Sequence, residues 1–140
     1  MSEEQLWGVI AGGNLGTVAT IKKDGRPQLS DVSYTAGDDR VIRFSTRTAL
    51  AKVHNLRRDP RVSIKVTAAG GWGYAVGEGT AELSAVSWAE DDATVEELIE
   101  IYRAIAGKEH PDWDDYRRAM VADGRLVVRI HVEHLYGWTQ

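Results

Sequence analysis

The sequence contains no cysteine, which excludes disulfide bonds, thiolate nucleophiles and cysteine-ligated metals. It has no long apolar run, and its first residues, Met1–Glu4, are acidic instead of basic. We therefore expect no secretory signal and no membrane-spanning helix, and we expect a cytoplasmic protein. Positive charge is in the minority, since the formal net charge is −4. This balance argues against a general nucleic-acid-binding or membrane-binding surface, so any basic site must be local.

Signatures of metal and nucleophile catalysis are missing as well. The four histidines form no H-x-H or H-E-x-x-H pattern: His54, His110, His131 and His134. No nucleophile elbow and no Ser/His/Asp order stands out. We therefore expect no metal site, and the sequence identifies no catalytic side chain.

What is present is the composition of a folded domain. Hydrophobic residues make up 43% of the chain and charged residues 27%, which is ordinary for a soluble globular protein. A length of 140 residues is enough for one domain with its own core. We find no repeat, linker or low-complexity segment, so we expect one domain over residues 1–140.

Alternating and β-branched segments separated by tight turns predict an antiparallel sheet. We expect strands at residues 15–22, 27–36, 40–46, 61–67, 72–76, 80–84 and 125–138, with 72–84 as one bent strand in an alternative. Helices are expected at residues 3–11, 48–58, 87–106 and 112–122. Since no βαβ run occurs, we predict a mainly β protein of the α+β class, an antiparallel sheet closed into a barrel with peripheral helices.

The junction between the strand at 40–46 and the following helix collects groups that bind an anion. Ser45 and Thr46 supply hydroxyls, while Arg47 and Lys52 supply positive charge. A helix N-terminus adds unpaired N–H groups and a favourable dipole. We therefore predict that this junction holds the phosphate of a cofactor. From spacing alone, a solvated basic helix face is an equal alternative.

Two further places suit a flat ligand. Asp31 and Ser33 share a strand face that is polar, which requires solvent, a partner or a ligand on that side. Trp72 and Tyr74 alternate with small residues, which suits a flat ring, a dimer contact or core packing. The sequence leaves these interpretations open.

Five segments, in order and at compatible spacing, together resemble the flavin/deazaflavin oxidoreductase family, the pyridoxamine-5′-phosphate-oxidase-like split β-barrel group. They are residues 14–20 (NLGTVAT), 24–28 (DGRPQ), 52–61 (KVHNLRRDPR), 77–81 (GEGTA) and 134–138 (HLYGW). Within that group the sequence is most similar to the small actinobacterial coenzyme F420-dependent reductases. The resemblance covers nearly the whole chain, although no single segment is decisive.

The resemblance implies a homodimer of split β-barrels with two cofactor sites at the dimer interface. The tricyclic ring is expected against Asp31, Val32 and Ser33, partly covered by the other subunit. Four residues match phosphate and tail contacts of the family: Ser45, Thr46, Lys52 and Asn55. Close relatives carry an arginine where this chain has Leu50, and Arg47 is the candidate for supplying that charge. Trp72 is the further candidate for a ring contact.

The function implied is that of an F420-dependent oxidoreductase, in which the reduced deazaflavin gives a hydride to an electron-poor, unsaturated small molecule. Three alternatives stay open. The same fold could bind FMN, or it could bind F420 as a carrier without turnover. A haem-binding split barrel is the weakest alternative, because no axial histidine stands out. The acidic tail of F420 would use more of the basic residues than FMN requires, including Arg57.

Overall fold

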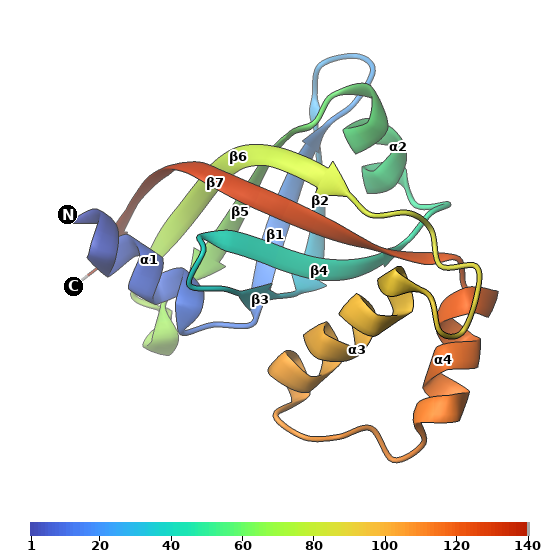
Figure 1. Cartoon of the computed structure of the whole chain (residues 1–140). Coiled ribbons are helices and arrows are strands. Elements are labelled where there is room, and N and C mark those ends of the chain that lie inside the picture. Colours follow the sequence, from blue (N-terminus) through green and yellow to red (C-terminus); the bar gives the residue numbers. More distant parts are fainter. Residues whose placement is uncertain (140) are drawn as a thin grey trace.

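The computed structural model describes residues 1–139. Within them, seven strands form one antiparallel sheet in the order β2-β1-β5-β6-β7-β4-β3, curled into a partial barrel (Figure 1). The elements are α1 Glu3–Ala11, β1 Leu15–Ile21, β2 Pro27–Ser33, β3 Thr35–Ala36, β4 Val41–Arg47, α2 Ala51–Arg58, β5 Arg61–Thr67, the 3-10 turn η1 Ala69–Gly71, β6 Gly73–Leu83, α3 Ala93–Ala106, α4 Trp113–Ala122 and β7 Arg125–Thr139. The predicted split-barrel fold is confirmed.

The core lies inside the barrel, where every second residue of a strand points. Ile42 and Phe44 of β4, Ile64 of β5 and Ile130 of β7 are fully buried there. A smaller apolar cluster forms on the outer side, where α3 and α4 pack against Val127 of β7. In Figure 1, α3 and α4 lie together beside β4, while α1 and α2 lie at opposite ends of the barrel. Among the described helices, none is both long and apolar enough to cross a bilayer.

The barrel is split because one segment supplies both edges of the sheet. β2 pairs with β1, and β3 pairs with β4, yet Tyr34 alone separates β2 from β3. The predicted continuous strand over 27–36 is therefore wrong. On the N-terminal side of Tyr34, β2 and β4 diverge, and no ladder joins them within residues 1–139. The result is an opening between the last residues of β2 and the last residues of β4.

Two helices begin later than predicted. The predicted helix over 48–58 begins at Ala51, because Thr48 donates its backbone N–H to the Gly124 carbonyl and is held in a turn. The predicted helix over 87–106 begins at Ala93, since the Asp92 carboxylate caps it by accepting the Val95 N–H at 2.8 Å. Lys52 consequently lies in the first turn of α2, closer to the preceding strand than the sequence indicated.

The segment 73–83 is one long strand, the alternative of a single bent strand that the sequence had left open. Its pairing with β7 shifts between Glu78 and Gly79, because Glu78 lies opposite His134 and Gly79 opposite Val132. Glu133 is thus the extra residue of a β-bulge. A Cβ atom at Gly79 would lie 1.9 Å from the His131 carbonyl oxygen, so only glycine fits this bend.

Candidate functional site

A cleft of about 340 Å³ lies where β2 and β4 diverge. The ends of both strands and the first turn of α2 form it, and the end of α3 and the start of β7 complete it. Its lining residues are Asp31, Val32, Ser33, Ser45, Thr46, Arg47, Leu50, Lys52, Ile105 and Arg125. Seven of the nine residues predicted to bind a cofactor are therefore brought together at this one place.

Positive charge dominates the cleft. Arg47, Lys52 and Arg125 line it, against the single carboxylate of Asp31. Within the part of the chain described, neither Arg47 nor Lys52 takes part in an ion pair, and Arg125 Nε lies 3.7 Å from the nearest carboxylate, that of Asp123. Partial burial, and then the charges of Arg125 and Arg47, hold the pKa of the Lys52 ammonium below its usual value. An anion in the cleft would relieve this repulsion.

Two donors in the cleft have no hydrogen-bond partner among residues 1–139. The Thr46 side chain is only 2% exposed, and its hydroxyl is unpaired. Arg125 Nε is also buried and unpaired, although Nη1 of the same side chain donates to the Ser45 hydroxyl at 3.4 Å. Buried polar groups in folded proteins nearly always find a partner. Two residues that line the cleft thus carry donors for which the described residues supply no acceptor, and the oxygen atoms of an anion are acceptors of the required kind.

The start of α2 differs from the starts of the three other α-helices described. Ser2, Asp92 and Asp112 each cap their helix with a side-chain oxygen. At α2 the cap position is Leu50, which provides no acceptor, and no acidic residue follows in the first turn. Val53 and His54 donate to the Leu50 carbonyl at 3.1 and 3.4 Å, so the N–H groups of Ala51 and Lys52 are the ones left for another acceptor. Leu50 and Lys52 both line the β2–β4 cleft, so this helix end is part of it.

The β2 side of the cleft is polar, as predicted. Asp31 and Ser33 are exposed and Val32 between them is buried, which is the alternation of a strand with one outward face. The Asp31 carboxylate is fixed in place, because it accepts a hydrogen bond of 2.8 Å from the Thr17 hydroxyl on β1. Carboxylate and hydroxyl groups held at this edge can meet the donors and acceptors of a heteroaromatic ring.

Asn55 and Trp72, the other two predicted residues, do not line the cleft. The Asn55 side chain is 7% exposed; it donates to the Thr20 hydroxyl at 3.1 Å and accepts from Arg58 at 3.1 Å. It thereby ties α2 to β1. Trp72 lies just before β6 and is 70% exposed. A cofactor contact by either residue remains a prediction.

Arg125 is the residue that the sequence analysis missed. It is the first residue of β7 and lies opposite Arg47 in the β4–β7 ladder. A separation of 78 positions hides this pairing from any local pattern. Two arginines, Arg47 and Arg125, therefore line the cleft together with Leu50.

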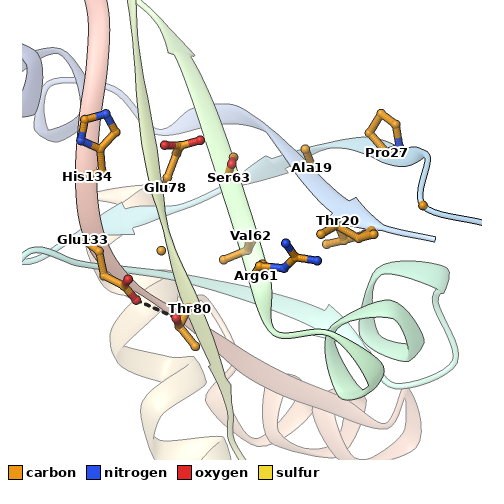
Figure 2. Close-up of a pocket in the computed structure, with 13 residues that line it drawn as sticks. Ala19, Thr20, Pro27, Arg61, Val62, Ser63, Glu78, Thr80, Glu133 and His134 are labelled. Atoms are coloured by element: carbon orange, nitrogen blue, oxygen red, sulfur yellow. Dashed lines mark hydrogen bonds between the residues drawn. The ribbon is translucent and has the colours of Figure 1, made fainter. Parts of the chain in front are cut away.

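A second hollow, of about 470 Å³, lies on the sheet across β1, β5, β6 and β7 (Figure 2). Its charged groups have mixed sign, since Glu78 of β6 and Glu133 of β7 face Arg61 of β5; His134 of β7 also lines it. Arg61 is already paired with the Asp59 carboxylate at 2.8 Å, and Glu133 accepts the Thr80 hydroxyl at 2.6 Å. The one cation of this hollow is therefore already compensated, unlike the three cations of the β2–β4 cleft.

Comparison with known proteins agrees with this architecture. A conserved hypothetical protein from Mycobacterium tuberculosis is 27% identical and superposes with a TM-score of 0.76 over 99% of this chain and 85% of that chain. A structure described as an F420 reductase is 21% identical, with a TM-score of 0.67 over 92% and 94%. A FAD-binding protein from Mesorhizobium loti is 19% identical, with a TM-score of 0.69 over 98% and 92%.

These similarities are low in sequence and extensive in structure, so the structural neighbours establish the fold. The family comparison reaches further, because it matches residues 2–139 to the family described as pyridoxamine 5'-phosphate oxidase. The match includes the β2–β4 opening and every residue that lines its cleft. This chain therefore belongs to the pyridoxamine 5'-phosphate oxidase family, and it shares its fold with an F420 reductase and a FAD-binding protein.

Proposed function

We propose that this protein is an oxidoreductase that binds coenzyme F420 in the β2–β4 cleft and reduces an electron-poor, unsaturated small molecule. When bound, the reduced deazaflavin supplies a hydride to the substrate. The observation that carries the proposal is the convergence of Arg47, Lys52 and Arg125 on a cleft whose Thr46 hydroxyl is unpaired. An F420 reductase among the structural neighbours supports it at the level of the fold.

Each part of the cleft has a distinct task in this proposal. Lys52 and the first-turn N–H groups of α2 hold the cofactor phosphate, and Thr46 and Ser45 add hydroxyl contacts. Asp31 and Ser33, on the exposed face of β2, orient the ring edge through hydrogen bonds. No side chain is assigned the role of proton donor. The protein's contribution is to bind, to orient and to exclude water.

FMN is the second candidate cofactor, because a FAD-binding protein among the structural neighbours supports a flavin as the alternative. The two cofactors differ in their anionic groups. FMN has a single phosphate, whereas the tail of F420 carries a phosphate together with carboxylates. Three cations against the Asp31 carboxylate leave a net charge of +2 in the cleft, which the phosphate monoester of FMN would also balance. The preference for F420 therefore rests on the sequence resemblance and on the F420 reductase among the structural neighbours.

Titration of the purified protein with F420 and with FMN, followed by fluorescence at several salt concentrations, tests the cofactor. We expect tight, salt-sensitive binding of F420 and no binding of FMN; the reverse result would overturn the assignment. Lys52→Ala and Arg47→Ala should each weaken F420 binding about tenfold or more, the value of a hydrogen bond to a charged group. Lys23→Ala, which removes an exposed charge in the β1–β2 turn, serves as the matched control.

Turnover separates an enzyme from a carrier. We expect the loaded protein to oxidise reduced F420 in the presence of quinones or conjugated enones, followed by the recovery of F420 absorbance. Binding without oxidation by any member of such a panel would favour the carrier. Lys52→Ala at saturating cofactor should retain turnover, because Lys52 holds the phosphate and is given no part in the hydride transfer.

A second copy of the chain is the proposed partner. Five large apolar side chains are exposed on the outward face of β1, β2, β6 and β7: Leu15, Leu29, Tyr74, Tyr136 and Trp138. Tyr74 lies opposite Trp138, and this face borders the cleft at Asp31. Exposed patches of this kind mark interaction surfaces. Sedimentation should give the mass of a dimer, and Trp138→Glu should shift it toward that of a monomer.

A further inference from the structure

The β4–β7 ladder places two pairs of arginines directly opposite each other. Arg47 faces Arg125, and four residues along each strand, on the same outward face, Arg43 faces Arg129. Like charges directly opposite on neighbouring strands are destabilising. A strand pair that carries this arrangement twice needs negative charge at both positions, and the two positions can be compared within one molecule.

The Arg43–Arg129 pair is neutralised by the protein itself. Glu97 on α3 lies between the two guanidinium groups: it is 3.5 Å from Arg43 Nε and accepts from Arg129 Nε at 2.8 Å. Asp39 binds Arg43 at 3.1 Å, and Glu82 lies 3.3 Å from Arg129. The repulsion of this pair is therefore replaced by a continuous network of ion pairs.

The Arg47–Arg125 pair has no equivalent carboxylate. Within residues 1–139 Arg47 forms no ion pair, and Asp123 approaches Arg125 only to 3.7 Å without accepting a hydrogen bond from Nε. Both arginines line the β2–β4 cleft, with Lys52 as a third cation. At this end of α3 the residue that lines the cleft is the apolar Ile105, so α3 supplies no carboxylate that corresponds to Glu97.

We propose that Arg47 and Arg125 form a clamp for a phosphate group of the ligand, which takes the place that Glu97 takes between Arg43 and Arg129. The inference rests on the proposed function for the identity of the ligand, and it adds Arg125 to the binding residues. Two guanidinium forks from adjacent strands suit a phosphate, because each fork offers parallel N–H donors to two oxygens. The ligand-free protein then carries a repulsion that binding removes.

If the clamp exists, Arg125→Gln should stabilise the ligand-free protein and at the same time weaken ligand binding. Arg125→Gln removes the repulsion and keeps a polar side chain, so the ligand-free variant should melt at a higher temperature than the wild type. The same variant should bind phosphate-bearing ligands about tenfold or more weakly, since it loses a charge-assisted pair of hydrogen bonds. A residue with a purely structural role would lower the melting temperature and leave binding unchanged.

The test measures melting temperatures of the full-length protein in chloride buffer and with added phosphate, pyrophosphate or acetate. Pyrophosphate and phosphate should raise the melting temperature of the wild type, and acetate at equal ionic strength should not. The rise should be largely lost in Arg125→Gln and partly kept in Arg125→Lys, which retains the charge without the fork. A larger rise with acetate than with phosphate would show a carboxylate site and overturn the phosphate assignment.

Arg129→Gln is the matched control, because Arg129 belongs to the neutralised pair. It should lower the melting temperature, because Glu97 and Glu82 lose an ion-pair partner, and the rise in melting temperature with phosphate should be unchanged.

Titrations with F420 and FMN separate this inference from the proposed function. One outcome is that the wild type binds neither cofactor, while phosphate raises the melting temperature of the wild type and not that of Arg125→Gln. The clamp then stands and the cofactor proposal fails. If F420 binds wild type and Arg125→Gln equally, the clamp is overturned and the cofactor proposal stands.

Discussion

The Tyr34 hydroxyl donates a hydrogen bond of 2.6 Å to the Ile10 carbonyl at the end of α1, at the point where the chain passes from one edge of the sheet to the other. The Tyr34 backbone N–H donates to the Asn14 carbonyl at 2.9 Å. Tyr34 is therefore anchored by two hydrogen bonds at the break between β2 and β3. This anchorage fixes where the split in the barrel begins.

We predict that Tyr34→Phe lowers the free energy of unfolding by about 1 kcal/mol, the net value of one hydrogen bond. The loss is moderate because Ile10 keeps a backbone donor, the N–H of Gly13 at 3.2 Å. Urea unfolding at neutral pH measures it. Tyr136→Phe, at an exposed position, is the control and should change little.

The same variant has an expected pH signature. Burial raises the pKa of Tyr34 to about 12, whereas an unfolded tyrosine ionises near 10. Above pH 10 the unfolded chain loses this proton and the folded protein keeps it, so stability falls as pH rises. Part of that fall should vanish in Tyr34→Phe; the rest persists because burial also raises the Tyr116 pKa to about 12. An identical alkaline fall in both proteins would contradict the prediction.

The pH dependence of anion binding should report on Lys52. Its pKa is lowered, first by burial and then by Arg125 and Arg47, so the ligand-free protein releases this proton below the usual lysine range. Phosphate affinity should therefore decline as pH rises through this lowered pKa. In Lys52→Arg the charge persists, and the affinity should stay level up to pH 10. Calorimetric titrations in two buffers of different ionisation enthalpy should show proton uptake by the wild type alone.

Two buried threonines allow a paired comparison. The Thr46 hydroxyl is unpaired, whereas the Thr20 hydroxyl accepts from Asn55 at 3.1 Å and donates to Gln28 at 3.3 Å. Thr46→Val should leave the ligand-free protein as stable or more stable, by up to about 1 kcal/mol, and should weaken phosphate binding. Thr20→Val should instead destabilise the fold by about 1–3 kcal/mol with phosphate binding unchanged. Equal stability losses in both variants would argue against the orphaned hydroxyl.

Asn55 is expected to act through the fold. Asn55→Ala should lower the free energy of unfolding by about 1–3 kcal/mol, because the buried Thr20 hydroxyl and the exposed Arg58 each lose a hydrogen bond. Its effect on F420 affinity should be clearly smaller than that of Lys52→Ala. An affinity loss as large as that of Lys52→Ala, at unchanged stability, would establish the direct contact that the family resemblance implies.

Local patterns predicted most of the strands and the polar face of β2, because alternation of side chains is a property of each strand by itself. The segment Arg61–Thr67 has the predicted bounds. The break at Tyr34 carried no such signal, since neither glycine nor proline stands there. It arises from the closure of the sheet, in which one segment must pair with two strands from far apart in the sequence.

The site divides in the same way. The strand-to-helix junction at Ser45–Lys52 is a local feature, and its residues predicted an anion site there, with a solvated basic helix face as an equal alternative from spacing alone. Helical spacing places Asn55 beside Lys52, but it could not show that Asn55 is hydrogen-bonded to Thr20 of another strand and does not line the cleft. Its contact with a cofactor stays a prediction. Arg125 was out of reach for the same reason, since its position depends on the register of the β4–β7 ladder.

The divergence of β2 and β4 has a consequence for how such proteins diversify. No inter-strand hydrogen bond crosses the opening in the described residues, so its width is not tied to the fixed spacing of a ladder. Small backbone changes beside Tyr34 can widen or narrow this opening while the remaining strands keep their registers. One scaffold can in this way accommodate coenzymes of different thickness and length without rebuilding its interior.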